Sequence, residues 1–316
     1  MKITIISHDD WGFNKQIAEE LERKGHVVTN INFSNFKYKY PNFSYKIYNF
    51  FLKALLKKNL KNIHFGKKII EHLKENKEKQ DIILTIKGDF IDPVSVLEFK
   101  KFTNKSIAYF NDNIYRCPKI IRVIPNFDEV FSFEKDDCEK YNLKFITNWI
   151  YTSKLEAKKE FDYQIFNISS KDKRFPLISK IAADLKSKGI VYKIIVFDKK
   201  MKTIDPNIEF ISKHIQISEV NKYINGSKLL LDISRKEQKG LTFRVFESLG
   251  LEKKLITTNT DIKNYDFYNP NNILIINEEN PVIPQDFLNY EYKEIPEFIL
   301  KKYALSNWVD IVFRSY

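Results

Sequence analysis

The chain has 316 residues, of which 43% are hydrophobic, 15% aromatic and 30% charged. This composition excludes an intrinsically disordered chain, and the length is sufficient for two domains of ordinary size. No apolar run reaches the ~18 residues that would predict a membrane-spanning helix.

Charge and cysteine content narrow the class of protein further. Lysine and arginine (53) exceed aspartate and glutamate (41) by 12. Such an excess favours an anionic partner, namely a nucleotide, a nucleic acid or an anionic lipid surface, although a lysine-rich composition without a partner explains it equally well. The start MKITIISHDD has no signal-peptide pattern, and the two cysteines, Cys117 and Cys138, suit a reducing compartment. We therefore expect a cytoplasmic protein.

Strand patterns alternate with helical patterns through the first half of the chain. Residues 2–8 (KITIISH) form a strand pattern, and the helical pattern after it ends at Gly25. Further strand patterns are HVVTNINF, DIILTIKG, SIAYFND, EVFSFE and KFITNWIY. Short apolar runs separated by helical segments predict βαβ units and a parallel sheet.

Residues 36–79 differ from the rest of this half, because aromatic residues and lysines interleave along them. Leu52, Leu55, Leu56 and Leu60 recur at helical spacing within this region. Basic amphipathic helices with aromatic residues favour an anionic membrane surface, and a lipid-linked acceptor would explain such a contact. A helix packed in the domain with a lysine-rich outer face is the alternative. No nucleic-acid motif is present, so we expect no nucleic-acid partner.

A second set of alternating patterns follows the polar segment TSKLEAKKEFD, which we interpret as a linker. Its strand patterns are YQIFNISS, YKIIVFD, IEFISKH, KLLLDIS, KKLITTN and NILIIN. The helical segment FPLISKIAADLKSKG has an apolar face and ends at Gly189. We therefore predict two doubly wound α/β domains, 1–155 and 156–295, that face a cleft. Residues 296–316 form one long helical pattern that either packs back on the first domain or caps the second.

Three loops after strands of the second domain carry groups that suit phosphate binding. The chain has no GxGxxG or GxxxxGK[ST] motif and only 8 glycines, so side chains and helix N-termini would have to hold a phosphate. The candidate residues in these loops are Ser169, Ser170, Lys171, Lys173, Arg174, Lys239, Gly240, Leu241, Thr242, Thr258 and Asn259. We expect Thr242 to cap the helix after it. The loops all lie at the carboxyl edge of the predicted sheet, where open α/β sheets bind ligands.

The run QKGLTFRVFESLGLEKKLITTNTDIKNYDFYNPNNILII resembles the donor-binding region of bacterial GT-B glycosyltransferases, more narrowly those of capsule and lipopolysaccharide assembly. In that family a glycine-led loop opens a helix that carries a carboxylate, followed by LG and a strand. The resemblance extends to FNISSKDKR and, in the first domain, to LTIKGD and the region from IAYFND to YNLKF. It implies two Rossmann-like domains and a nucleotide-sugar donor.

The resemblance implies roles for two residues of the helix. Glu247 matches the carboxylate that binds the ribose hydroxyls of the donor, and Arg244, three residues earlier, is placed to neutralise phosphate. Without the resemblance, a surface Arg–Glu pair would be the simpler interpretation. Many retaining enzymes of this fold have a second glutamate eight positions earlier, where this chain has Lys239. The stereochemistry therefore stays open, with inversion favoured.

Inverting transfer needs a base for the acceptor hydroxyl, which we expect in the first domain. Asp112 in YFNDN is ranked first, followed by Asp10 and Asp89; Asp9 lies beside Asp10. Helix or turn capping is the alternative role for each of them.

Two histidines and the absence of a metal motif complete the expected site. His8 and His214 also end strands; a structural role is the default for each, and His214 lies on the donor side, where it can contact phosphate. No DxD-type motif lies at a plausible position, so we expect neither a metal nor another cofactor.

The sequence thus predicts metal-independent glycosyl transfer from a nucleotide-diphosphate sugar to a surface glycan or lipid-linked acceptor, inside the cell at the inner membrane face. The alternatives are a nucleotide-sugar epimerase of the same fold and a catalytically silent member that binds glycan or nucleotide in an assembly complex.

Overall fold

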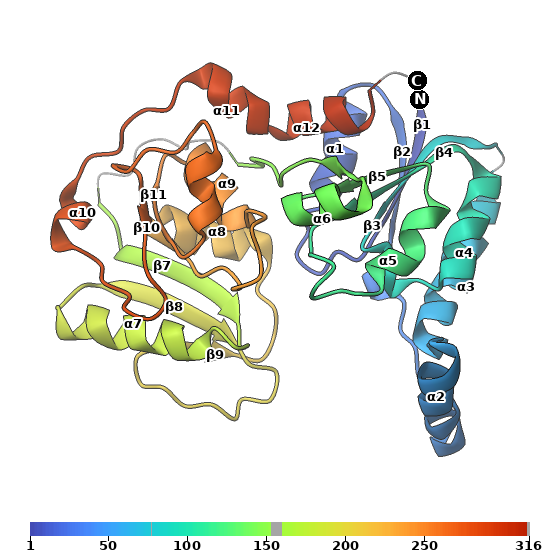
Figure 1. Cartoon of the computed structure of the whole chain (residues 1–316), viewed down its shortest axis with the longest axis horizontal. Coiled ribbons are helices and arrows are strands. Elements are labelled where there is room, and N and C mark those ends of the chain that lie inside the picture. Colours follow the sequence, from blue (N-terminus) through green and yellow to red (C-terminus); the bar gives the residue numbers. More distant parts are fainter. Residues whose placement is uncertain (77, 153–159, 315–316) are drawn as a thin grey trace. The chain divides into compact units, whose positions relative to one another are not determined.

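The computed structural model describes residues 1–76, 78–152 and 160–314, which form two compact units. The N-terminal unit contains Met1–Thr147 together with the residues from Val309 onward, and the C-terminal unit contains Asn148–Trp308. The predicted domain boundary between residues 155 and 156 lies outside the described residues. Each unit consists of a parallel sheet with helices on its faces (Figure 1).

The described residues of the N-terminal unit form a sheet in the order β2-β1-β3-β4-β5-β6. Its strands are β1 (Lys2–Ser7), β2 (Val27–Asn32), β3 (Gln80–Ile86), β4 (Thr103–Phe110), β5 (Glu129–Ser132) and β6 (Lys144–Phe145). Its helices are α1 (Lys15–Arg23), α2 (Phe43–Leu56), α3 (Leu60–Glu75), α4 (Pro93–Glu98), α5 (Ile120–Val123) and α6 (Lys135–Tyr141). All strand pairs are parallel, and the strand order reverses between β1 and β3. Ligands of open α/β sheets bind at the carboxyl edge of such a switch point.

The C-terminal unit has the same architecture with the order β12-β11-β10-β7-β8-β9. Its strands are β7 (Tyr163–Ser170), β8 (Tyr192–Phe197), β9 (Glu209–Ile211), β10 (Ser227–Asp232), β11 (Lys254–Thr257) and β12 (Ile273–Ile275). The helices from residue 160 onward are α7 (Phe175–Ser187), α8 (Ile217–Asn225), α9 (Phe243–Gly250), α10 (Gln285–Asn289), α11 (Glu297–Tyr303) and α12 (Leu305–Val312), and the division between the units falls within α12. The switch point lies between β7 and β10.

Side-chain alternation along the strands explains why this sheet is covered on both faces. Ile165 and Leu229 pair in register and pack with α7, whereas the next pair, Phe166 and Leu230, packs with α8 and α9. Successive strand residues point to opposite faces, so a strand that is apolar at every position needs a helix layer on each face. The prediction of two doubly wound α/β domains is confirmed.

The C-terminal segment differs from the single long helix that its pattern predicted. Ala304 is extended (ψ 145°) and separates α11 from α12. The backbone N–H of Ile150 donates to the carbonyl of Tyr303 at 2.7 Å, and the N–H of Leu305 donates to the carbonyl of Ile150 at 3.1 Å. This short parallel bridge replaces helical hydrogen bonds at Ala304, so a tertiary contact that periodicity does not encode breaks the helix.

Candidate functional site

The connection from β10 to α9 positions the residues of the sequence motif in the C-terminal unit. Thr242 is the N-cap residue of α9, but its side chain accepts no capping hydrogen bond, so the expected capping role is wrong. Its hydroxyl instead donates to Oδ1 of Asp232 at 2.9 Å and ties the helix start to the end of β10. Burial raises the pKa of Asp232, while Thr242, Arg174 and Arg244 act in the opposite direction.

Arg244 and Glu247 form a buried ion pair on α9. Arg244 Nη1 lies 2.5 Å from Glu247 Oε2, and the two side chains are only 11% and 2% exposed. Glu247 Oε1 accepts a hydrogen bond from the hydroxyl of Tyr151, and the guanidinium of Arg244 lies 5.3 Å from the ring centroid of Phe166. The carboxylate expected to face the cleft is therefore enclosed, and burial raises its pKa against the opposing effects of Arg244 and Tyr151.

Gly250, the last residue of α9, explains how Tyr151 reaches this pair. A Cβ atom at Gly250 would lie 2.1 Å from the carbonyl oxygen of Thr152 and 2.6 Å from Cγ2 of Ile150. Only glycine permits this close approach of segment 150–152 to the helix. The LG dipeptide of the motif thus places Tyr151 against Glu247. Tyr151 was not among the predicted site residues, since it precedes Glu247 by 96 positions and no local spacing links the two.

Two arginines at the β7–β10 switch point share one carboxylate. Arg174 precedes α7, and its Nε and Nη2 donate to the two oxygens of Asp172 at 2.9 and 2.8 Å. Arg174 Nη1 also donates to the carbonyl of Ile233, just after β10, at 2.7 Å. Arg235 Nη2 lies 3.3 Å from Asp172 Oδ2. Burial acts to raise the pKa of Asp172, but hydrogen bonds from Arg174 and the charge of Arg235 outweigh it and lower the pKa.

Two guanidinium groups therefore lie against one carboxylate where β7 and β10 end. The side chains of Arg174, Asp172 and Arg235 are 16%, 28% and 30% exposed, so solvent reaches the group. A guanidinium fork suits the geometry of phosphate oxygens. Of these residues the sequence predicted only Arg174; Arg235 lies in a loop already singled out for its composition.

The other predicted donor residues lie in different surroundings. Ser170, the last residue of β7, and Lys173, three residues later, are exposed, and Lys171 pairs with Asp198 at 3.3 Å. His214 is exposed beside edge strand β9 and stacks on Phe197, the last residue of β8, with ring centroids 4.2 Å apart.

Residues of the β10–α9 and β11 loops are mainly structural. Leu241 is 1% exposed and belongs to the core, so its side chain is not at a ligand surface. Gly240 is buried and its carbonyl accepts a hydrogen bond from Gln238. Asn259 is 3% exposed, and its Nδ2 donates to the carbonyl of Lys239 at 3.1 Å, which holds the loop in place.

In the N-terminal unit, the predicted carboxylates follow three adjacent strands. Asp10 comes after β1, Asp89 after β3 and Asp112 after β4, so the structure brings them to one carboxyl edge. Asp112 forms ion pairs with Arg116 and, at 3.8 Å, with Lys87. Both contacts hold the Asp112 carboxylate in ion pairs at this edge.

His8 lies at the same edge beside Asp10. His8 Nδ1 is 3.5 Å from Asp10 Oδ2, and the two side chains are 18% and 46% exposed. Burial lowers the pKa of His8; the charges of Lys87 and Lys61 lower it further, whereas Asp10 raises it. His8 is therefore neutral at pH 7, with a carboxylate beside one ring nitrogen. This is the arrangement in which an imidazole accepts protons.

Asp9, by contrast, has a structural role. Its carboxylate accepts hydrogen bonds from the backbone N–H groups of Gly12, Asn14 and Lys15 at 2.8, 2.9 and 3.0 Å. It thereby caps the turn that leads into α1, and the capping alternative holds for this residue.

Several buried polar atoms at this edge have no hydrogen-bond partner among the described residues. They are Ser7 Oγ, Asn14 Oδ1, Thr85 Oγ1 and Asn111 Oδ1. Buried polar groups normally have partners, so unpaired ones at a sheet edge favour a position for water or a polar ligand.

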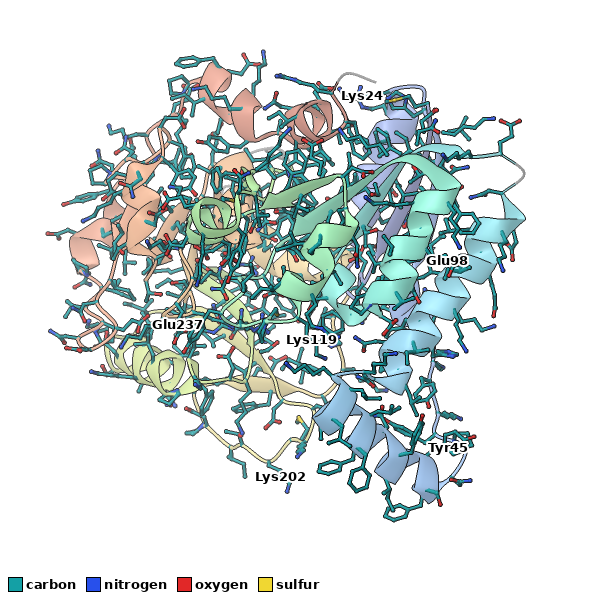
Figure 2. All side chains as sticks on the ribbon, turned by 45° about the vertical axis from the view of Figure 1, so that its right-hand side comes forward. Lys24, Tyr45, Glu98, Lys119, Lys202 and Glu237 are labelled. Carbon is teal, nitrogen blue, oxygen red and sulfur yellow. The ribbon has the colours of Figure 1, made fainter. Side chains whose placement is uncertain are left out.

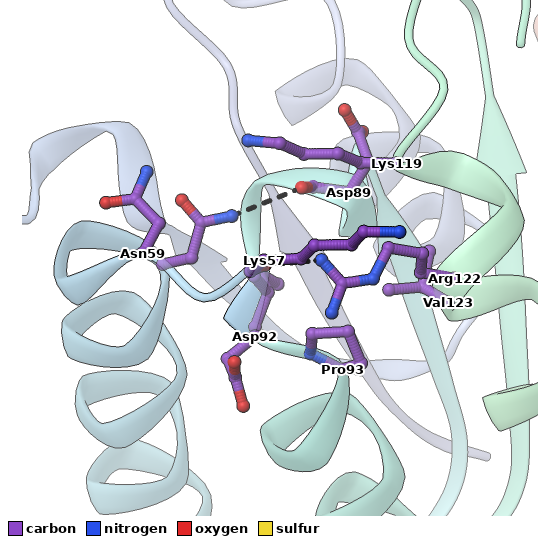
Figure 3. Close-up of a pocket in the computed structure, with 10 residues that line it drawn as sticks. Lys57, Asn59, Asp89, Asp92, Pro93, Lys119, Arg122 and Val123 are labelled. Carbon is purple, nitrogen blue, oxygen red and sulfur yellow. Dashed lines mark hydrogen bonds between the residues drawn. The ribbon is translucent and has the colours of Figure 1, made fainter. Parts of the chain in front are cut away.

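Asp89, which follows β3, lines a narrow pocket together with residues from the ends of α2 and α5. Figure 3 shows the side chains of Lys57, Lys119 and Arg122 around Asp89. The enclosed space of about 20 Å³ is sufficient for a water molecule but not for a sugar. Burial, together with the charge of Asp112, raises the pKa of Asp89 to about 6.

The raised pKa of Asp89 predicts a pH-dependent stability effect. A carboxyl group whose pKa is higher in the folded state stabilises the fold at low pH, and this contribution is lost as the pH rises through about 6. Asp89→Asn removes the buried charge. Above pH 7 the variant should exceed the parent protein in free energy of unfolding by up to ~3 kcal/mol, and the difference should vanish towards pH 4. Urea unfolding of the variant and the parent protein, above pH 7 and near pH 4, measures this difference in free energy. An equal difference at the two pH values would show that Asp89 does not titrate between them.

The expectation about metals is not tested by the structure. The described residues contain no group of three or more His, Cys, Asp or Glu side chains that could hold a metal ion.

Comparisons with known proteins identify the fold. No protein-family model and no curated protein matches the sequence. Among solved structures, the chain is similar to a UDP-forming α,α-trehalose-phosphate synthase from Burkholderia xenovorans, with TM-score 0.57, 11% identity and coverage of 98% of this chain and 97% of that one. It is also similar to a UDP-N-acetylglucosamine 2-epimerase from Rickettsia bellii, with TM-score 0.50, 10% identity and coverage of 100% and 96%. A glycosyltransferase involved in avilamycin A biosynthesis gives TM-score 0.50, 8% identity and coverage of 99% and 93%. These similarities show the GT-B fold, as predicted.

Proposed function

We propose that the protein is a glycosyltransferase that uses a nucleotide-diphosphate sugar as donor. The observation that carries this proposal is the pair Arg174 and Arg235, which share Asp172 at the switch point of a Rossmann-like unit. A positively charged fork at this edge suits a diphosphate, and the switch point is where such folds bind nucleotides. The names of the similar structures agree, since two of them refer to UDP or a UDP-sugar.

We assign the donor to the C-terminal unit and the acceptor to the N-terminal unit. Arg174 and Arg235 would bind the diphosphate. The buried pair Arg244–Glu247 would support the β10–α9 loop, and Glu247 would meet a ribose directly only by displacing Tyr151. We also propose that the acceptor is a surface glycan or lipid-linked glycan, that the protein works at the inner face of the membrane and that the reaction needs no metal.

Within the N-terminal unit, we propose that His8 is the base and that Asp10 orients it. In an inverting reaction, the base takes the acceptor hydroxyl proton while that oxygen attacks the anomeric carbon and the nucleoside diphosphate leaves. His8 is neutral at pH 7 and partly exposed, whereas Asp112, ranked first from the sequence, is held by two cations. Asp112 and Asp89 remain predictions as alternative bases.

Nucleotide binding tests the donor site. Arg174→Gln and Arg235→Gln should each weaken the binding of a nucleoside diphosphate by ~10–100-fold, because each removes a charge-assisted contact of ~1.5–3 kcal/mol. The affinity for the bare nucleoside should change much less. A thermal-shift screen of UDP-, GDP-, CMP- and dTDP-sugars first identifies the nucleotide that the protein binds. Isothermal titration calorimetry then measures the affinities for its nucleoside diphosphate and for the bare nucleoside.

Arg23→Gln is a matched control, because Arg23 forms an ion pair with Glu20 on the surface of α1. It should leave both affinities unchanged. Equal losses for the diphosphate and the nucleoside would refute a phosphate role for Arg174 and Arg235. Interconversion of the donor without an acceptor would instead identify an epimerase, and binding without turnover would identify a silent member.

A further inference from the structure

Helix α2 exposes almost all of its apolar side chains. Large hydrophobic residues of this 14-residue helix that are 45–76% exposed are Phe43, Tyr45, Ile47, Tyr48, Phe50, Phe51, Leu55 and Leu56. Only Asn49 and Leu52 of the helix are buried. Figure 1 shows α2 extending beyond the layer formed by α3 and α4. Figure 2 shows the side chain of Tyr45 on the outside of α2, directed away from that layer.

The attachment of α2 to its unit is narrow but specific. Asn49 Oδ1 accepts from the backbone N–H of Leu60 at 2.8 Å, and Asn49 Nδ2 donates to the hydroxyl of Tyr40 at 2.7 Å. Arg122 donates to the carbonyl of Lys57, the residue just after the helix, at 2.5 Å. These contacts fix the base of α2 without covering its sides. A helix of this length is marginal in water unless its apolar face is packed, so contact with another apolar surface would stabilise α2.

The charged residues along the stretch of chain that contains α2 are of one sign. No aspartate or glutamate occurs between Lys24 and Ile70, whereas Lys37, Lys39, Lys46, Lys53, Lys57, Lys58, Lys61, Lys67 and Lys68 lie in the same stretch. Lys46 and Lys53 are seven residues apart, on the same face of the helix as Asn49. Phe43, Ile47, Phe50 and Ala54 follow one another at the spacing of a different face.

We infer that α2 is a membrane-docking helix that inserts its aromatic and aliphatic side chains into the interface of an anionic lipid bilayer. An apolar face of Phe, Ile and Leu beside exposed lysines is the pattern of helices that lie in the headgroup region. The lysines add attraction to anionic headgroups. The inference narrows the expected contact from residues 36–79 to one helix and is independent of the donor site. No helix among the described residues is both long and apolar enough to cross a bilayer.

A bilayer explains these features better than a protein or nucleic-acid partner. Exposed apolar side chains occur around most of the circumference of α2, which is more than the single stripe that a protein groove covers. Single-stranded nucleic acid would use rings as stacking platforms and would not need Leu55 and Leu56, which are 76% and 60% exposed.

Vesicle sedimentation with the full chain tests the inference. The parent protein should bind anionic vesicles of phosphatidylcholine and phosphatidylglycerol more tightly than neutral vesicles of phosphatidylcholine alone, and binding to the anionic vesicles should fall as salt is raised. A triple variant, Phe43→Ser, Phe50→Ser and Leu55→Ser, should weaken binding by more than ~10-fold because it removes the inserted side chains. Its fold should persist, since these side chains are 66–76% exposed.

Two further variants separate apolar from electrostatic contributions. Lys46→Gln, Lys53→Gln and Lys58→Gln together should reduce binding by roughly fivefold per lysine and flatten the salt dependence. The matched control is Val191→Ser with Ile204→Ser and Val282→Ser, which changes three hydrophobic residues of the C-terminal unit that are 54–93% exposed and should not alter binding.

Two outcomes would overturn the inference. The first is that neither vesicle type binds, or that neutral and anionic vesicles bind equally. The second is a lipid-independent dimer in analytical ultracentrifugation that the Phe43, Phe50 and Leu55 triple variant abolishes, since a second copy of the chain would then cover α2. Nucleotide binding is measured without lipid, so failure here leaves the donor-site proposal standing.

Discussion

Glu247→Ala should lower the free energy of unfolding of the C-terminal unit by ~3–5 kcal/mol, because it leaves the Arg244 guanidinium buried without its ion-pair partner. Arg244 is only 11% exposed and Glu247 only 2%, so water cannot replace the lost carboxylate. The hydroxyl of Tyr151 would lose its acceptor as well. A loss of this size is a large fraction of the ~5–15 kcal/mol that stabilises a typical domain. Thermal and urea unfolding of the full chain measure it.

The burial of Glu247 changes what the ribose-binding role implied by the resemblance would predict for this substitution. A carboxylate facing a cleft can be removed without harm to the fold, whereas a buried one cannot. Glu297→Ala is the matched control, because Glu297 forms an exposed pair with Lys301 on α11 at 3.0 Å and should leave the melting temperature unchanged. If Glu247→Ala also unfolds like the parent protein, the ion pair has no structural importance and direct ligand binding becomes the better role for Glu247.

Glu247→Gln separates the structural role from the donor role. The amide keeps the shape of the side chain and an oxygen that accepts from Tyr151, but it carries no charge to balance Arg244. We expect an intermediate loss of stability. Nucleoside binding that falls in Glu247→Gln while the fold persists would support contact between Glu247 and the ribose.

Strands and sheet architecture were predictable because buried parallel strands are apolar at nearly every position. YQIFNISS coincides with β7 from Tyr163 to Ser170, and the apolar face of α7 packs in the core as expected. Periodicity reports such burial directly. It could not predict the break at Ala304, where Ile150 from a distant segment takes the backbone hydrogen bonds.

The chemistry of the candidate site was predictable by position but not by environment. Asp10, Asp89 and Asp112 follow strands of one sheet, so their common edge could be inferred from the sequence. The sequence does not show that Arg116 and Lys87 pair with Asp112, or that burial moves the pKa of Asp89 to about 6. Burial and long-range charge decide which group accepts a proton, and both depend on the folded chain.

The proposed base predicts the second large effect, which concerns turnover. His8→Gln should reduce glycosyl transfer by ~10²–10⁴-fold, the usual contribution of general base catalysis. Nucleoside diphosphate affinity should stay unchanged, because the proposed donor site belongs to the other unit. Single-turnover transfer assays and calorimetry on the same variant measure the two quantities.

The pH dependence distinguishes a base from a residue that only supports the fold. Transfer should fall as the pH drops through the pKa of His8, which burial holds below the usual pKa of a histidine. The charge of Asp10 raises that pKa, so in Asp10→Asn the fall of the transfer rate on the acidic side of its pH profile should move to lower pH. Asp10→Asn should also reduce transfer less than His8→Gln does. If His8 were only structural, its substitution would instead lower the melting temperature, and Asp10→Asn would leave the pH dependence of transfer unchanged.

Asp112→Asn is the decisive comparison. If His8→Gln turns over normally and Asp112→Asn does not, the sequence-based ranking of Asp112 is right and its pairing with Arg116 must loosen when the acceptor binds. If neither substitution nor Asp89→Asn affects transfer, no side chain of this edge takes the proton. A retaining reaction, in which the leaving phosphate accepts the acceptor proton, would then replace the inverting mechanism.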